Sequence, residues 1–263
     1  MSQDLSPAST EVWMGKTVQR RNMLKQYFEN LYTGSQPEFF KRASLAMDQE
    51  EKLFVVTANP ETMMIGVQDQ DLDAVLCKPS TVIVPDGIGV VKGAQSLGIE
   101  TQGRVTGVEL AAHLIRHAGE TNRSIYLYGA KEEVLQSLVS RIQREHPGAV
   151  IAGCRNGYGQ DDDEVFEEIL RLKPDVILVA LGIPRQELLI DRWLPRFSKG
   201  IFVGVGGSFD VLSGSKKRAP QFFVRCNLEW LYRIMKEPKR FGRFYRSNLR
   251  FFREVKQLKR LGR

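Results

Sequence analysis

Short apolar runs recur along the chain from about Lys52, separated by stretches with helical periodicity. The six runs cover residues 53–57, 81–84, 124–128, 150–152, 176–180 and 201–205. Because nearly every position in them is apolar, they predict strands buried on both faces, as in a parallel sheet. The crossover helices are expected over residues 107–118, 131–145, 162–172 and 184–194. The pattern predicts an α/β fold, a Rossmann-like and mostly parallel sheet with helices on both faces.

This pattern divides the chain into three parts. Residues 1–50 are mixed and polar, with one helix expected near 17–31, and we assign them no function. Residues 51–220 form the α/β core, which we expect to bind a nucleotide sugar. Residues 221–263 form a helical appendage, in which Pro238 is expected to separate a helix at about 221–236 from a second helix in the tail.

Positive charge is concentrated in that tail. Residues 233–263 carry twelve Lys and Arg against two Glu, a balance of +10, whereas the whole chain has a formal charge of +7, so residues 1–232 sum to −3. A nucleic-acid binder is expected to spread its charge over the body, so no nucleic-acid partner is predicted. A cationic tail on a nearly neutral body favours an anionic membrane surface.

The tail also has apolar residues at helical spacing among its basic ones. Such a stripe is typical of an amphipathic helix at a membrane interface, although packing on the chain's own domain or on a dimer partner would give the same pattern. The stripe comprises Phe241, Phe244, Tyr245, Phe251, Phe252, Val255 and Leu258. Membrane association is the reading we favour, and assembly with further copies of the chain stays open.

Nothing in the sequence predicts export or a membrane span. The first residues lack the basic start and apolar run of a signal peptide, and no stretch approaches about 18 apolar residues. We therefore expect a cytoplasmic protein, peripheral at the inner face of the cell membrane. Cys77, Cys154 and Cys226 lie far apart without CxxC spacing, which favours buried, reduced thiols.

Glycine and polar residues gather where the predicted strands end, which is where ligands bind in such sheets. The loops cover residues 57–61, 85–89, 128–130, 181–187 and 204–210. Gly204, Gly206 and Gly207 would let backbone amides approach a diphosphate, although tight turns alone explain this loop equally well. The strict GxGxxG of a dinucleotide-binding dehydrogenase is absent, which disfavours that class.

Three loops carry candidates for chemistry. Asp86 stands between Pro85 and Gly87 after a strand, so it is a candidate general base or else a turn-forming or helix-capping residue. Arg104, just before the helix at 107–118, could stabilise a leaving phosphate or be a surface arginine. Gln186 and Glu187 begin a helix at the cleft edge, where Glu187 alone is also explained by the helix dipole.

No metal site is predicted. Asp69, Asp71 and Asp73 have the DxD spacing of many metal-dependent glycosyltransferases, but they follow a predicted helix and are better explained as a solvated acidic turn. Residues 161–163 are three aspartates that suit the acidic start of a helix. His113 and His117 share a helix face but lack the glutamate of HExxH and a third ligand.

Together these loops resemble the WecG/TagA/CpsF family, glycosyltransferase family 26. Seven blocks between about Lys52 and Arg243 occur in the family order, whereas the family's usual opening strand is hard to find before Lys52. The blocks are Thr57-Ala58-Asn59-Pro60-Glu61, Pro85-Asp86-Gly87-Ile88-Gly89-Val90-Val91, Arg104-Val105-Thr106-Gly107, Gly182-Ile183-Pro184-Arg185-Gln186-Glu187, Gly204-Val205-Gly206-Gly207-Ser208-Phe209-Asp210, Lys217-Arg218-Ala219-Pro220 and Leu228-Glu229-Trp230-Leu231-Tyr232-Arg233.

The resemblance implies an inverting, metal-independent transferase without a cofactor, acting from a UDP-sugar donor onto a polyprenyl-diphosphate-linked acceptor. It implies that Asp86 is the base, that Thr57, Arg104 and Gln186 line the pocket, and that residues 206–210 hold UDP. Arg233 and Arg240 would reach the acceptor diphosphate. The residues assigned to substrate binding are Asn59, Gly129, Tyr158, Gly182, Gly206, Gly207, Asp210, Arg233 and Arg240.

The donor and the class of protein keep alternatives. The Asn-Pro-Glu loop at 59–61 looks like that of the teichoic-acid members, which transfer N-acetylmannosamine to undecaprenyl-diphospho-N-acetylglucosamine. Another donor, N-acetylmannosaminuronic acid or a hexose, is the first alternative. The second is a noncatalytic nucleotide- or membrane-binding module, for which the same glycine loops and basic tail would suffice.

Overall fold

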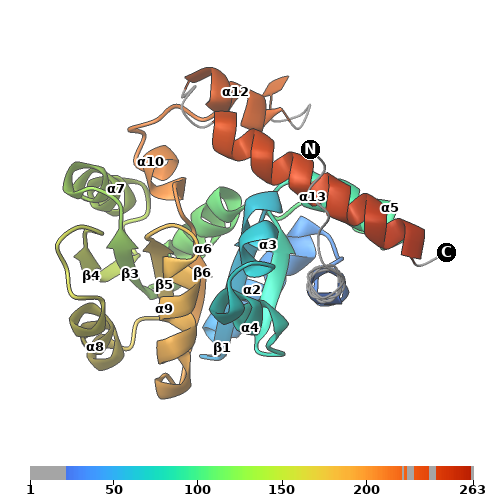
Figure 1. Ribbon diagram of the computed structural model, residues 1–263. Helices are drawn as coiled ribbons and strands as arrows, with labels where there is room; N and C mark the ends of the chain where they lie inside the picture. The colour runs from blue at the N-terminus through green and yellow to red at the C-terminus, as the bar shows by residue number, and fades with distance from the viewer. Residues whose placement is uncertain (1–21, 221, 224–227, 237–240, 262–263) are drawn as a thin grey trace.

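The computed structural model describes residues 22–220, 222–223, 228–236 and 241–261. One sheet of six parallel strands forms its centre, in the order β2-β1-β6-β5-β3-β4 (Figure 1). The strands are β1 (Lys52–Ala58), β2 (Thr81–Pro85), β3 (Ser124–Gly129), β4 (Val150–Arg155), β5 (Val176–Ala180) and β6 (Gly200–Gly204). All six apolar runs are therefore strands, and the predicted α/β fold with a parallel sheet is confirmed.

The helices form two layers, one on each face of the sheet. Along β1, Phe54 and Val56 belong to one apolar core and Leu53 and Val55 to the other, because successive side chains of a strand point to opposite faces. The first core is covered by α3 (Pro60–Gly66), α4 (Gln70–Cys77), α5 (Ile88–Ser96), α8 (Asp162–Leu172) and α9 (Arg185–Trp193). The second is covered by α2 (Gln36–Asp48), α6 (Gly107–Thr121), α7 (Glu132–Glu145) and α10 (Ser208–Leu212).

The four predicted crossover helices are confirmed as α6, α7, α8 and α9. Thr106 and Asp161 begin α6 and α8, since each side-chain oxygen accepts hydrogen bonds from amides of the first turn. Asp161 to Asp163 are thus the acidic start of a helix, as expected. A short 3₁₀ helix, η1 (Leu194–Arg196), follows α9.

The part before β1 is more ordered than its composition indicated. Residues 22–29 are helical, which confirms part of the helix expected at 17–31, and residues 17–21 lie outside the described ones. The helix α2 begins with a capping box at Ser35 and buries Phe39, Ala43 and Met47. In residues 22–51 the structure has no strand, but Leu31 makes an isolated parallel bridge to Ile83 of β2.

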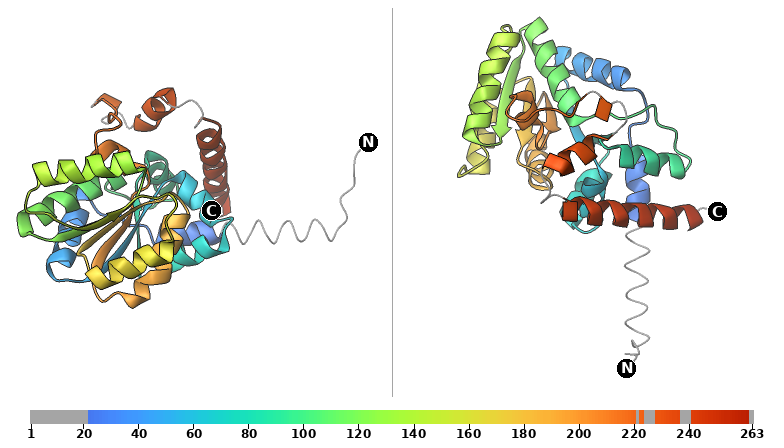
Figure 2. Two further views of the ribbon diagram at one scale, coloured as in Figure 1. Left: turned by 90° about the vertical axis from the view of Figure 1, so that its left-hand side faces the viewer. Right: turned by 90° about the horizontal axis from the view of Figure 1, so that it is seen from above.

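The described C-terminal residues include the helices α12 (Glu229–Lys236) and α13 (Phe241–Leu261). Figure 2 shows α13 as a long rod lying across one side of the α/β body, where it packs against α3 and α5. Phe251 is buried there, and a side chain at Gly93 of α5 would come within 2.9 Å of its ring. The predicted break at Pro238 lies outside the described residues.

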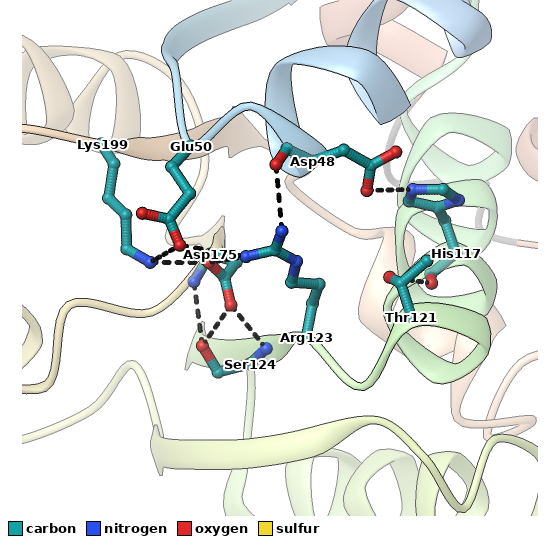
Figure 3. Close-up of polar contacts among 8 residues, drawn as sticks. All are labelled: Asp48, Glu50, His117, Thr121, Arg123, Ser124, Asp175 and Lys199. Atoms are coloured by element: carbon teal, nitrogen blue, oxygen red, sulfur yellow. Dashed lines mark hydrogen bonds and ion pairs between the residues drawn. The ribbon is translucent and has the colours of Figure 1, made fainter.

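Ion pairs join the amino ends of the strands, on the edge of the sheet opposite to the predicted site (Figure 3). Asp175, just before β5, accepts hydrogen bonds from the backbone and hydroxyl of Ser124 at 2.9 and 2.7 Å. Lys199, just before β6, donates to Asp175 at 2.9 Å and to Glu50 at 3.2 Å. Arg123 donates to Glu50 as well. This cluster holds the starts of β1, β3, β5 and β6 in register.

The burial expected for the cysteines and the search for a membrane-spanning helix can also be compared with the structure. Cys77 and Cys154 are free thiols, but they are half-buried instead of buried. Burial, aided by the nearby Asp73, raises the pKa of the Cys77 thiol to about 11, so it stays protonated and unreactive. Cys226 lies outside the described residues. No helix in the described ranges is long and apolar enough to cross a membrane.

Candidate active site

The predicted site residues follow the strands in spatial order along the carboxyl edge of the sheet. Asp86 follows β2, Thr57 is the last residue but one of β1, and Gly206 follows β6. Gly182 follows β5, whereas Gly129 ends β3 and Tyr158 lies beyond β4. Neighbouring strands are about 4.8 Å apart, so β2 and β4 are separated by roughly 24 Å. The sheet therefore gathers Asp86, Thr57 and the 182 and 206 loops, and places Tyr158 at the far end.

Asp86 is fixed at both its backbone and its side chain. Its amide donates to the carbonyl of Ala58 at 2.9 Å, and its Oδ1 accepts from the amide of Gly107, the first residue of α6, at 2.9 Å. The carboxylate therefore lies at the positive end of the α6 dipole. The helix-capping alternative is thus a real contact, made through one carboxylate oxygen of Asp86.

Thr57 connects the carboxyl end of β1 to that of β6. Its hydroxyl donates to the carbonyl of Gly204 at 2.9 Å. A Cβ atom at Gly107 would lie only 3.3 Å from that hydroxyl oxygen, so the helix can start this close to β1 because residue 107 is glycine. Asp86 and Thr57 consequently share one backbone neighbour, Gly107.

Gln186 connects the loops that follow β5 and β6. Its Oε1 accepts from the amides of Gly182 and Gly206, both at 3.1 Å. Both glycines have positive φ, +82° and +48°, a conformation that glycine adopts readily and that directs the two amides to one acceptor. Gln186 is 2% exposed, so it lies beneath the loops and not at the cleft edge as the sequence indicated.

Glu187 differs more from its expected role. It is 1% exposed, its Oε1 accepts from Nε2 of Gln186 at 2.7 Å, and its Oε2 is a buried atom without a hydrogen-bond partner. Burial raises the pKa of this carboxyl to about 7, although the Gln186 hydrogen bond opposes the shift. A carboxyl that is only partly ionised near pH 7 gains less from the helix dipole, so the dipole alone does not explain Glu187.

Arg104 belongs to a series of linked ion pairs between α12 and α6. It contacts Oε2 of Glu229, the first residue of α12, at 2.9 Å. Arg218 contacts Glu229 at 3.4 Å and Glu109 of α6 at 2.6 Å. Burial raises the pKa of Glu109, but hydrogen bonds from Arg218 and Thr106 outweigh it and hold the pKa below its ordinary value. These ion pairs attach α12 to Arg104 and, through Arg218, to α6; Figure 1 draws α12 above α10.

Sequence reasoning assigned no role to Glu229 or Arg218, and it did not predict the burial of Glu187. Glu229 and Arg218 stand inside two of the matched blocks, which was the available signal. Their pairing across eleven positions depends on how α12 folds back, which no local pattern reveals. Glu187 is polar at the start of a helix, and such residues are usually solvated, so its burial gave no signal.

The remaining substrate-binding candidates have mixed surroundings. The side chain of Asn59 caps α3 through bonds to the amides of Glu61 and Thr62 at 2.8 and 3.0 Å. Asp210 in α10 pairs with Lys216 at 3.4 Å. Gly129 lies beside Gly157, and the following residue, Tyr158, is 65% exposed. Asn59 is therefore close to Asp86, whereas Tyr158 is a surface residue distant from it.

The acidic and histidine clusters that were rejected as metal ligands have structural roles. Asp69 caps α4 through the amides of Asp71 and Leu72, and Asp73 accepts a hydrogen bond from Tyr27. His117 pairs with Asp48 at 2.9 Å. Across the described segments, no group of three or more His, Cys, Asp or Glu is arranged to hold a metal ion.

The two predicted acceptor arginines are not placed at side-chain level. Arg233 lies in α12, and its side chain lies outside the described part. Arg240 lies outside the described residues altogether. Their contact with an acceptor stays a prediction.

An open parallel sheet with an acidic side chain, an arginine and two glycine loops at its carboxyl edge is the architecture of a nucleotide-dependent α/β enzyme. Comparison with known proteins identifies the family of this chain. The chain belongs to the Glycosyl transferase WecG/TagA/CpsF family, whose model matches residues 23–263. It is accordingly a glycosyltransferase, and the resemblance found in the sequence is confirmed.

Curated relatives are similar over three quarters of the chain. A protein of Bacillus spizizenii named N-acetylglucosaminyldiphosphoundecaprenol N-acetyl-beta-D-mannosaminyltransferase is 41% identical over 197 residues, 75% of this chain and 76% of that protein. The Bacillus subtilis protein of the same name is also 41% identical, covering 75% and 77%. One from Staphylococcus aureus strain MW2, again of that name, is 35% identical over 198 residues, covering 75% and 78%.

Proposed function

We propose that this glycosyltransferase moves N-acetylmannosamine from UDP-N-acetylmannosamine to undecaprenyl-diphosphate-linked N-acetylglucosamine, in cell-wall polysaccharide synthesis. The relatives' shared name supports the acceptor and the sugar. The observation that carries the proposal in this chain is the convergence of Asp86, Thr57 and the Gln186-linked glycine loops at one edge of the sheet.

In the proposed reaction Asp86 is the general base. Its carboxylate takes the proton of the acceptor hydroxyl while that oxygen attacks the anomeric carbon of the donor from the face opposite to the leaving group. The bond from that carbon to the diphosphate oxygen breaks, and UDP leaves with the electron pair. One displacement inverts the configuration at the anomeric carbon.

The leaving diphosphate would be stabilised without a metal. The amides of the 206 loop and the guanidinium of Arg104 are the groups we assign to it, because backbone N–H groups and arginine both bind phosphate oxygens. Arg104 is held beside Glu229, so phosphate binding would draw on an arginine already oriented by α12. Thr57 and Gln186 shape the pocket through their bonds to Gly204 and Gly206.

The acceptor and the membrane are assigned to the tail. Three exposed apolar side chains of α13, Tyr245, Leu249 and Phe252, are 51%, 54% and 41% exposed. With about 100° between successive residues of a helix, these three and Lys256 project on one side, away from the buried Phe251. That side presents apolar and basic residues together, which suits the anionic inner face of a cell membrane.

The proposed activity is tested by product mass. The purified chain is incubated with UDP-N-acetylmannosamine, UDP-N-acetylglucosamine or UDP-glucose and a short-chain lipid-diphosphate-N-acetylglucosamine, with and without excess EDTA. We expect one added N-acetylhexosamine with the first donor alone, undiminished by EDTA. A product with another donor would change the assigned sugar, and activity restored only by magnesium or manganese would contradict the metal-free mechanism. UDP binding without any product would leave a binding module.

A further inference from the structure

The buried pair Gln186 and Glu187 is unusual because its polar atoms are directed at each other and at backbone amides. The Oε1 of Gln186 accepts hydrogen bonds from the amides of Gly182 and Gly206, and its Nε2 donates to Glu187. A side-chain amide can flip by 180°, which would exchange its oxygen and nitrogen. The amides of Gly182 and Gly206 can only donate, and the Oε1 of Glu187 accepts from Nε2, so these contacts together select one orientation of the Gln186 amide.

The strand β6 leaves space for this pair. A Cβ atom at Gly204 would lie 2.6 Å from Nε2 of Gln186 and 3.1 Å from Oε1 of Glu187. Gly204 is also the residue whose carbonyl accepts from Thr57. The pair is thus packed directly beneath the loop at 206, on the strand that also holds Thr57.

We propose that Glu187 is a positioning residue: it fixes the amide of Gln186, and through that amide it sets the spacing of the 182 and 206 loops. The inference rests on the proposed function in one respect, since those loops are the ones we assign to the donor diphosphate. Glu187 itself touches neither the donor nor the acceptor in this scheme.

The neutral form of Glu187 suits this position. One oxygen accepts from Gln186, and burial of the other without a partner is tolerable for a neutral acid but costly for a carboxylate. Since burial raises the pKa of Glu187 to about 7, raising the pH above 7 charges the group. The charge can be solvated only if the pair shifts, which releases the two glycine amides.

Neighbouring charges do not provide an alternative cause of the raised pKa of Glu187, whose largest cause is burial. The strands β5 and β6 contain no titratable side chain, and Lys52 is at the far end of β1. Arg196 of η1 stacks on Trp193. Several of the other charged groups on α9, α4 and α8 are engaged in pairs of their own: Arg185 with Asp162, Arg192 with Asp163, Asp191 with Lys78, Asp73 with Tyr27, and Glu168 with Arg155.

The test measures affinity for UDP-N-acetylmannosamine by calorimetry at pH 6.0 and 8.5. Its diphosphate is esterified at both ends, so the donor loses no proton in this range. We expect the wild-type Kd to rise roughly five- to tenfold, the effect of about one lost hydrogen bond. Glu187→Gln keeps the acceptor oxygen but cannot ionise, so it should bind equally at both pH values. Asp191→Asn, on the same helix, should retain the wild-type rise.

Two further measurements separate positioning from a general structural effect. In a double-mutant cycle, Glu187→Ala should weaken binding in the wild type but not in a Gln186→Ala background, because Glu187 acts through Gln186. Without any donor, Glu187→Ala should speed hydrogen exchange of the Gly182 and Gly206 amides, whereas Glu187→Gln should not.

The outcomes distinguish this inference from the proposed function. Wild-type protein that binds no UDP-sugar overturns the proposed function, and the exchange rates of the two glycine amides then decide the role of Glu187. Binding with the same pH dependence in wild type and Glu187→Gln overturns the inference alone. Unchanged exchange at both amides in Glu187→Ala overturns it as well.

Discussion

Asp86 has an observed capping contact and a proposed role as general base, and a substitution can separate the two. Its Oδ1 accepts from the Gly107 amide at 2.9 Å, and asparagine retains that acceptor while losing the basic oxygen. Asp86→Asn should therefore leave the thermal unfolding midpoint and UDP affinity nearly unchanged and lower turnover by roughly 10²-fold or more. Asp86→Ala should in addition destabilise the chain, because α6 loses an N-terminal acceptor.

Asp69→Asn is the matched control for this substitution. Asp69 also accepts from the amides at a helix start, those of Asp71 and Leu72 in α4, but it lies outside the site. Turnover should be unaffected by it. Near-normal turnover in Asp86→Asn, measured as UDP release, would reduce Asp86 to its capping contact.

At the scale of residues, the sequence was informative where the neighbouring residues alone determine the position of a side chain. Asp86 follows a strand and precedes glycine, so its place at the sheet edge could be predicted. The depth of Gln186 and Glu187 could not, because their burial depends on the absence of a side chain at Gly204, which is distant in sequence. Local patterns locate loops but do not show what lies beneath them.

At the scale of elements, Asp175 is the centre of the ion-pair cluster at the amino ends of the strands. Burial raises the pKa of Asp175, but the hydrogen bonds from Lys199 and Ser124 outweigh it and hold the pKa below its ordinary value. A lowered pKa means stability that is complete above the unfolded-state pKa of about 4 and is lost as the pH falls through the folded-state value.

Asp175→Asn should therefore lower the free energy of unfolding at pH 7 by about 3 kcal/mol, as for a largely buried ion pair that loses one partner. The difference from wild type should shrink as the pH falls below about 4, since the wild-type carboxyl then becomes neutral too. Urea unfolding at pH 7 and pH 3.5 measures both values. An equal loss at both pH values would mean that the charge of Asp175 contributes nothing.

The helices and strands differ in how clearly the sequence predicts them. The six strands and four crossover helices have clear apolar periodicity and were predicted correctly. The helix α2 was missed, although Ser35 and Glu38 form a capping box, because its buried face is made of Phe39, Ala43 and Met47 among charged residues. Short helices such as α3 and α4 are defined by caps and packing more than by periodicity.

For the whole molecule, the tail is the part where the sequence left two interpretations, and the structure shows packing on the chain's own domain along one face of α13 while membrane association stays a prediction. Phe251, Val255 and Leu258 are buried against the first core, which is the packing alternative. Tyr245 and Phe252 are exposed, and the side chains of Phe241 and Phe244 lie outside the described part. The single apolar stripe expected from the sequence is therefore two faces of α13, since residues 251 and 252 point about 100° apart.

This division changes how membrane binding should be tested. Removing everything after Pro220 would uncover Phe28 and Gly93, which pack on Phe251, so loss of binding could follow from unfolding. Arg253, Lys256 and Lys259 are exposed instead. Replacing all three by Gln keeps the buried face intact and removes three positive charges from the exposed one.

We expect this triple variant to keep the wild-type unfolding midpoint and the affinity for UDP-sugar, but to sediment poorly with vesicles of anionic lipid. Each basic residue near such a surface contributes on the order of 1 kcal/mol, so three together should weaken binding by roughly 100-fold. A control triple, Arg116, Lys131 and Arg144 to Gln, removes the same charge from α6, the residue before α7 and α7, and should bind as wild type. Equal loss in both triples would indicate attraction by overall charge, and binding that survives the first triple and high salt would contradict a membrane role for α13.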